Sequence, residues 1–113
     1  MGRGMQGLVP LTIKDTTLLY ESYMPFIKGG GLFIPTPKRF SLGDDVFIRF
    51  TLMDELDKLP VPGKVIWITP AGSQSGRIAG IGVQLNDPTG SVRSKIETYL
   101  VGALESDRET STL

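Results

Sequence analysis

The feature that most constrains the fold is an alternation of apolar and polar residues with a period of two, broken at short intervals by glycine, proline and aspartate. The clearest case is "VFIRFTLM", in which the apolar side chains fall on one face: Val46, Ile48, Phe50 and Leu52. Arg49 and Thr51 fall on the opposite face. Short alternating segments separated by turn residues predict a small antiparallel sheet or barrel with one buried face.

Four segments are well-marked strands, and a fifth is weaker. The weaker one, "LVPLTIK" from Leu8 to Lys14, contains Pro10, which has no ladder donor and therefore indicates an edge strand or a bulge. The well-marked segments are "GLFIPT" from Gly31, "VFIRFTLM" from Val46, "VPGKVIWITP" from Val61 and "RIAGIGVQL" from Arg77. A charged connection, "DELDKLP", and a loop, "AGSQSG", join the later strands, so the last two form a predicted hairpin.

Side-chain alternation also predicts the faces of this hairpin. One set is expected to face the core: Ile66, Ile68, Ala79, Ile81, Val83 and Leu85. Val65 and Trp67 are then expected on the other face, with Trp67 lying across the bare backbone of Gly80 and Gly82. Trp67, together with Pro70, is either an exposed anchor for a partner or is covered by the C-terminal helix.

One strong helical pattern follows, "TGSVRSKIETYLVGALES", for which Asp87 before Pro88 is the predicted start. Its apolar stripe predicts core packing: Val92, Ile96, Tyr99, Leu100, Ala103 and Leu104. The polar segment from about 105 to 113 is predicted to be disordered. A shorter helical turn is expected in "DTTLLYESYMPF", capped by Asp15 and ended by Pro25.

This shorter segment carries more large apolar side chains than two or three turns bury against one sheet. Its candidate partner-binding residues are Tyr20, Tyr23, Met24 and Phe26. Tyr20 is the leading candidate, placed beside Met24 at i+4, whereas Leu19 and Tyr23 are expected to pack inward. The alternative is that all of these side chains seal the open end of a barrel.

Composition excludes several classes of function. The 113 residues are expected to form one domain, 1–113, and the net charge of +0 gives no overall attraction to nucleic acid or to an anionic membrane. The absence of Cys and His removes thiol chemistry, the commonest general base and the commonest metal ligand, so neither catalysis nor a metal or cofactor is expected. With no signal peptide and no segment of ~20 apolar residues, the expected location is the cytoplasm, without membrane insertion.

The glycines of "KGGGLFIPTPKRF" raise the possibility of a phosphate site, because glycine-rich turns form anion-binding concavities beside a lysine. The Walker and dinucleotide motifs are both absent, and these glycines precede a strand instead of a helix. The segment is therefore interpreted as a turn whose glycines permit unusual dihedral angles.

The order of a glycine turn before "GLFI", then "SLGDDVFIRFTL", "VPGKVIWITP" and "AGIGVQL" before a terminal helix resembles the PilZ domain family, over roughly Gly7 to Leu104. The resemblance implies a six-stranded antiparallel β-barrel with a C-terminal helix, an all-β fold apart from that helix. Most PilZ domains bind cyclic di-GMP through an R-x-x-x-R pair and a [DN]-x-S-x-x-G motif. With the last motif glycine on Gly31, Phe26 and Lys28 occupy the acidic and serine positions, and the arginine pair is absent.

Two functions follow from this comparison. The short members of the family imply a non-enzymatic adaptor of type IV pilus assembly, whose partners are the assembly ATPase and an EAL-domain cyclic di-GMP receptor of the FimX type. The alternative is a cyclic di-GMP receptor that binds through Lys28, Gly31, Lys38 and Arg39. The absence of the arginine forks that pair with phosphates favours the adaptor.

Overall fold

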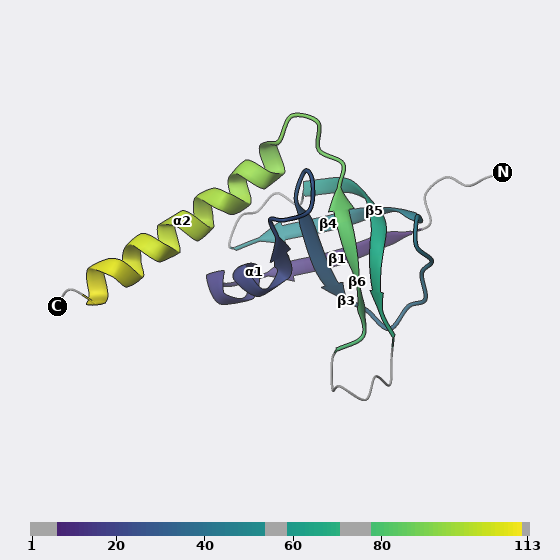
Figure 1. Ribbon diagram of the computed structural model, residues 1–113, viewed down its shortest axis with the longest axis horizontal. Coiled ribbons are helices and arrows are strands. Elements are labelled where there is room, and N and C mark those ends of the chain that lie inside the picture. Colours follow the sequence, from purple (N-terminus) through teal and green to yellow (C-terminus); the bar gives the residue numbers. More distant parts are fainter. Residues whose placement is uncertain (1–6, 54–58, 71–77, 112–113) are drawn as a thin grey trace.

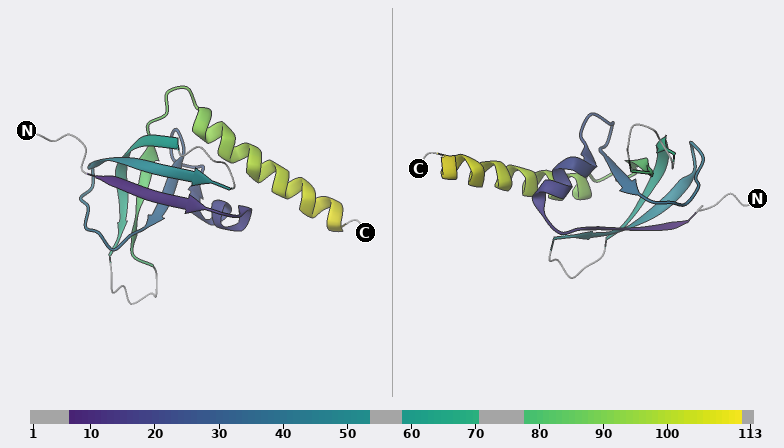
Figure 2. Two further views of the ribbon diagram at one scale, coloured as in Figure 1. Left: turned by 180° about the vertical axis from the view of Figure 1, so that it is seen from behind. Right: turned by 90° about the horizontal axis from the view of Figure 1, so that it is seen from below.

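A single curled sheet of six strands organises the computed structural model, which describes residues 7–53, 59–70 and 78–111 (Figure 1). The elements follow in the order β1 (Leu8–Ile13), α1 (Thr16–Ser22), β2 (Tyr23–Met24), β3 (Gly31–Pro35), β4 (Asp45–Leu52), β5 (Leu59–Thr69), β6 (Gly80–Leu85) and α2 (Ser91–Ser111). Across the sheet the strand order is β1-β4-β5-β6-β3-β2. The turned views in Figure 2 show how strongly this sheet curls.

The sheet is mixed, which corrects the expectation of purely antiparallel strands. β1 pairs with β4 in parallel, whereas the other neighbouring strands pair antiparallel. Parallel pairing needs a long crossover, and the chain between β1 and β4 supplies one with α1, β2 and β3. The two-residue strand β2 was absent from the sequence prediction, because its residues follow directly on a helical segment.

The predicted edge position of β1 is confirmed. Residues 7 and 13 both turn their carbonyl groups toward β4, accepting from Phe47 N–H at 3.0 Å and Met53 N–H at 2.7 Å. Because backbone groups alternate in direction along a strand, Pro10 faces the free side. Its missing N–H therefore costs no ladder hydrogen bond and leaves one donor fewer on the exposed edge.

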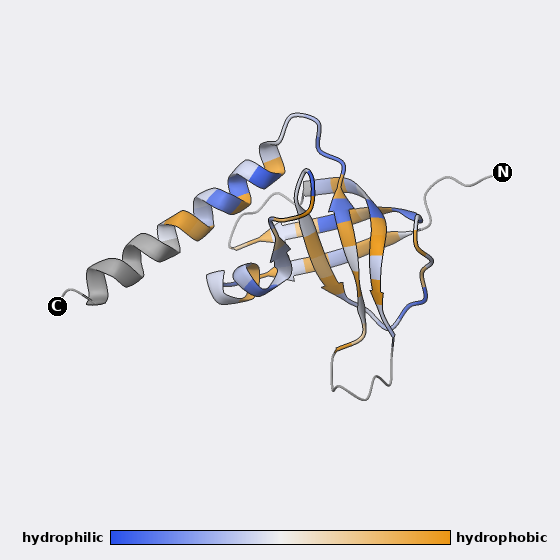
Figure 3. Cartoon of the chain, in the orientation of Figure 1, coloured by the Kyte–Doolittle hydropathy of each residue, from blue (hydrophilic) through white to orange (hydrophobic). Residues whose placement is uncertain are grey.

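The predicted inward face of β4 is also confirmed. Val46, Ile48, Phe50 and Leu52 are all at most 1 % exposed. Figure 3 shows the alternation of apolar and polar residues along the strands. The remaining core is contributed by every other strand and both helices: Val9, Leu11, Ile13, Leu19, Tyr23, Leu32, Ile34, Val61, Val65, Ile81, Val83, Leu85 and Ile96.

A bulge in β5 makes the predicted hairpin faces only half correct. Val65 pairs with Val83, but the next pair is Trp67 with Gly82, so Ile66 is the extra residue. An extra residue reverses the faces on one side of the bulge relative to the other. Val65 is therefore buried, contrary to the prediction, and Ile66 is only half-buried.

Beyond the bulge the predicted sides of Trp67 and Ile68 are confirmed. Trp67 lies outside, and Ile68, opposite Ile81, packs against the core. The predicted "AGSQSG" loop and most of the "DELDKLP" connection lie outside the described residues.

The glycine turn before β3 has the unusual backbone geometry that was predicted. Gly29 and Gly30 have φ angles of +82° and +91°, which side chains disfavour. The Gly30 N–H donates to the Ile27 carbonyl at 2.7 Å, and the Gly30 carbonyl accepts from Leu85 N–H at 2.9 Å. The turn therefore serves to bring the chain into β3 beside β6.

Helix α1 begins as predicted, with the Asp15 carboxylate accepting from Leu18 N–H at 2.8 Å. It ends at Ser22 and not at Pro25, because Tyr23 adopts extended dihedral angles and starts β2. Tyr20 and Met24 consequently do not share a helix face, which corrects the predicted i+4 pair. Leu19 and Tyr23 pack inward, as predicted.

Helix α2 begins at Ser91, later than predicted, after a turn in which Gly90 has a φ of +72°. Asp87 still caps it, since its carboxylate accepts from Val92 N–H at 2.8 Å. The predicted stripe packs against the core at Val92, Ile96, Tyr99 and Leu100, whereas the side chains of Ala103 and Leu104 lie outside the described residues.

The helix then continues to Ser111, past the start of the predicted disordered tail at about residue 105 (Figure 1). Glu105, Arg108 and Glu109 are strong helix formers, which favours helix beyond the last core contact. Within the described ranges, neither helix has the length and apolar character needed to cross a bilayer.

Candidate protein-interaction site

An open groove of about 570 Å³ lies between α1, the turn after β2, and α2. We call it the α1–α2 groove. The described residues of its walls are mainly aromatic and aliphatic, and one of them is charged: Tyr20, Tyr23, Pro25, Phe26, Glu97, Leu100 and Val101. The two helices pack against each other beside it.

The residues of this groove differ in how far their side chains are exposed to solvent. Tyr20 is 74 % exposed and Phe26 is 79 % exposed, so these two rings do not seal the interior. Tyr23 is only 6 % exposed, and its hydroxyl bonds to Glu97, another residue of the groove. Val101 adds a further exposed aliphatic side chain from α2. The groove therefore presents apolar side chains to solvent from both α1 and α2.

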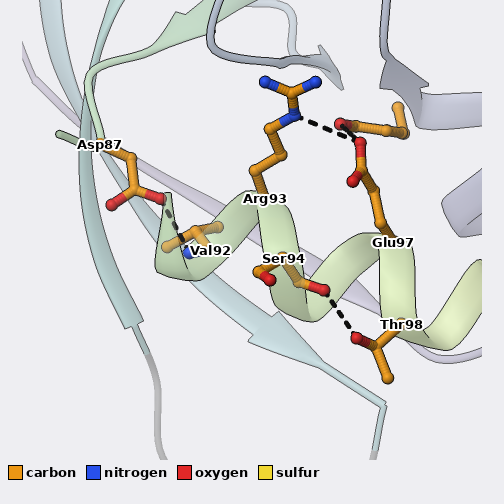
Figure 4. A network of polar contacts seen from close by, with 7 residues as sticks. Asp87, Val92, Arg93, Ser94, Glu97 and Thr98 are labelled. Atoms are coloured by element: carbon orange, nitrogen blue, oxygen red, sulfur yellow. Dashed lines mark hydrogen bonds and ion pairs between the residues drawn. The ribbon is translucent and has the colours of Figure 1, made fainter. Parts of the chain in front are cut away.

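A polar network at the groove ties β2 to α2 (Figure 4). The Tyr23 hydroxyl donates to Glu97 Oε2 at 2.8 Å, and Arg93 Nε donates to the same oxygen at 3.2 Å. These hydrogen bonds, the one from Tyr23 first, lower the pKa of Glu97 below its ordinary 4.5. Burial, followed by the bond to Glu97, raises the pKa of Tyr23 above 10.0. Arg93 and Glu97 were not predicted, although their i,i+4 spacing on a helix was a readable signal.

Tyr23→Phe is expected to lower the free energy of unfolding by about 1 kcal/mol at neutral pH, because it removes this hydrogen bond. A carboxyl with a lowered folded pKa stabilises the fold above its ordinary value and loses that contribution as pH falls through the folded pKa. The difference between Tyr23→Phe and wild type should therefore shrink below pH 4.5. Urea unfolding of both proteins, at neutral pH and again below pH 4.5, measures this difference in the free energy of unfolding. An equal difference under the two conditions would contradict the role of Glu97.

Trp67 forms the centre of a second exposed surface, on the outer side of β3, β6 and β5. It is 53 % exposed, so α2 does not cover it as the alternative prediction required. Gly82 lies opposite both Trp67 and Phe33, and a methyl group added there would sit 2.9 Å from the Trp67 Cβ and 3.3 Å from the Met24 Cε. The predicted packing of Trp67 over bare glycine is thus confirmed at Gly82. We call Met24, Phe33 and Trp67 the Trp67 face.

The predicted partner residues therefore divide between two surfaces. Tyr20, Tyr23 and Phe26 belong to the α1–α2 groove, whereas Met24 and Trp67 belong to the Trp67 face. Pro70 is exposed just beyond the end of β5.

The residues of the alternative ligand site do not come together. Lys28 lines an open cleft of about 620 Å³ that also contains Lys64, Asp45 and Asp87. Lys38 and Arg39 line a different hollow, and β3 separates them from Lys28 in the chain.

Gly31 lies in a tightly packed position. A methyl group there would lie 3.0 Å from an Ile27 side-chain carbon and 3.2 Å from both the Met24 Cε and the Val83 carbonyl oxygen. Glycine at this position therefore eases the fit of β2 and its turn against β3.

Comparison with known proteins identifies one family. The family model described as the PilZ domain matches residues 3–102. Among curated proteins, none matches the chain.

Proposed function

Because the chain belongs to the PilZ-domain family, we propose that it is a non-enzymatic adaptor of type IV pilus assembly, and so of twitching motility, acting in the cytoplasm through protein–protein contacts. The observation that carries the proposal is the chemistry of the segment before β3. Where ligand-binding relatives place phosphate-binding groups, this chain presents the exposed rings of Tyr20 and Phe26 beside α2. Large apolar rings fit a protein surface better than a charged dinucleotide.

We propose that each of the two surfaces contacts one of the two partners. We assign the α1–α2 groove to the pilus assembly ATPase and the Trp67 face to an EAL-domain cyclic di-GMP receptor of the FimX type. Each surface centres on an exposed aromatic side chain, the residue type most often found at binding hot spots. The rings of Tyr20 and Trp67 belong to different elements, α1 and β5, and we propose that one molecule contacts both partners at the same time.

The charges around Lys28 argue against tight binding of cyclic di-GMP. Its cleft also holds the carboxylates of Asp45 and Asp87, which repel phosphates. Lysine supplies a point charge without the planar fork by which arginine pairs with phosphate and stacks on guanine.

Calorimetric titration of the full chain with cyclic di-GMP is expected to show no micromolar binding. The physical reason is the absence of an arginine fork beside the mixed charges of the Lys28 cleft. Lys28→Ala serves as the matched variant. Micromolar binding by wild type would overturn the proposal in favour of a cyclic di-GMP receptor, and its loss in Lys28→Ala would place the ligand at Lys28.

A further inference from the structure

The hollow at the far end of β3 from Lys28 is lined by hydrogen-bond donors and cations, and no carboxylate is among its described lining residues. Its volume is about 300 Å³. It lies between the turn after β3, the end of β5 and the start of β6, and its lining residues include Thr36, Lys38, Arg39, Phe40, Thr69 and Pro70.

Both threonine hydroxyls in this hollow already accept a hydrogen bond. Thr36 Oγ1 accepts from the Lys38 N–H at 3.2 Å, and Thr69 Oγ1 accepts from the Trp67 indole N–H at 2.9 Å. A hydroxyl that accepts still has its own hydrogen to donate. Thr69 is 8 % exposed.

The two cations of the hollow are uncompensated. Lys38 and Arg39 are exposed, and neither forms an ion pair with any residue in the described ranges. The Lys28 cleft differs, since its lysines share the space with aspartates. Two cationic side chains and two threonines therefore line the hollow, and groups of these kinds pair favourably with a carboxylate or phosphate.

We propose that this hollow binds the carboxylate side chain of an acidic segment in a partner protein. Phe40, Ile68 and Pro70 give the hollow apolar walls, which suit the methylene groups of such a side chain. The Trp67–Thr69 hydrogen bond links the hollow directly to the Trp67 face, so an apolar neighbour of the carboxylate packs on the exposed ring. The proposed contact depends on the lining of the hollow and is independent of the proposed role in pilus assembly.

The test is an NMR titration of the full chain with an acetylated, amidated peptide of alternating leucine and glutamate. We expect the amide signals of Thr36, Lys38 and Arg39 to shift. The double variant Lys38→Gln/Arg39→Gln should weaken the binding about tenfold or more, since charge-assisted hydrogen bonds are lost. Lys28→Gln is the matched control and should bind like wild type.

Two further titrations test whether the hollow selects a carboxylate over an amide and over inorganic phosphate. The same peptide with glutamine in place of glutamate should cause no shift at these amides. Inorganic phosphate should cause at most weak shifts, because it lacks the apolar stem that the walls contact. Phosphate binding without glutamate-peptide binding, equal binding of the glutamine peptide, or unchanged binding by the double variant would each overturn the proposal.

Discussion

Tyr20→Ala is expected to weaken binding to the pilus assembly ATPase by about 2 kcal/mol, roughly 30-fold, while leaving the thermal midpoint unchanged. The ring is 74 % exposed, so the folded chain gains little from it. It lines the α1–α2 groove together with Phe26, Leu100 and Val101, where a partner would bury it with these neighbours. Loss of a buried aromatic anchor is the commonest cause of a large binding defect.

Three variants make this result interpretable. Leu18→Ala changes another partly exposed α1 side chain that does not line the groove, and should bind normally. Tyr20→Phe separates the ring from the hydroxyl. Leu19→Ala removes a fully buried side chain and should lower stability by about 2–5 kcal/mol, which shows what a core defect looks like. A lowered midpoint for Tyr20→Ala, with binding retained by the folded fraction, would contradict the interface.

The sequence was most informative where one local rule decides the outcome. Alternation was enough to predict the buried face of β4, because no bulge interrupts the pairing of Val46 to Phe50 with β5. Pro10 predicted an edge strand because proline lacks a donor, and Asp15 predicted a cap because its carboxylate satisfies a free N–H. The exposure of Tyr20 followed from the inward packing of Leu19 and Tyr23.

What the sequence did not reveal depends on tertiary pairing. The bulge at Ile66 reverses a face, but nothing in "KVIWIT" marks which residue lacks a partner. The parallel pairing of β1 depends on how the chain returns from β3 to β4. The hydrogen bond from Tyr23 to Glu97 joins residues 74 positions apart, so neither local spacing nor composition predicts it.

Trp67→Ala is expected to weaken binding to the EAL-domain receptor by about 1 kcal/mol or more, roughly fivefold or greater, with little change in stability. Trp67 is 53 % exposed and contacts Gly82 on the outer side of the sheet, so its removal uncovers backbone without opening the core. Trp67→Phe should retain part of the affinity because it keeps an aromatic ring over the glycine.

Each of the two aromatic variants serves as the control for the other. Trp67→Ala should leave the ATPase bound as in wild type, and Tyr20→Ala should leave the EAL-domain receptor bound, because the two rings belong to separate surfaces. Leu8→Ala, which removes an exposed side chain from β1 at the sheet edge, should affect neither. If either aromatic variant loses both partners while its thermal midpoint is unchanged, the two surfaces form one site, and the assignment of separate partners to them is wrong.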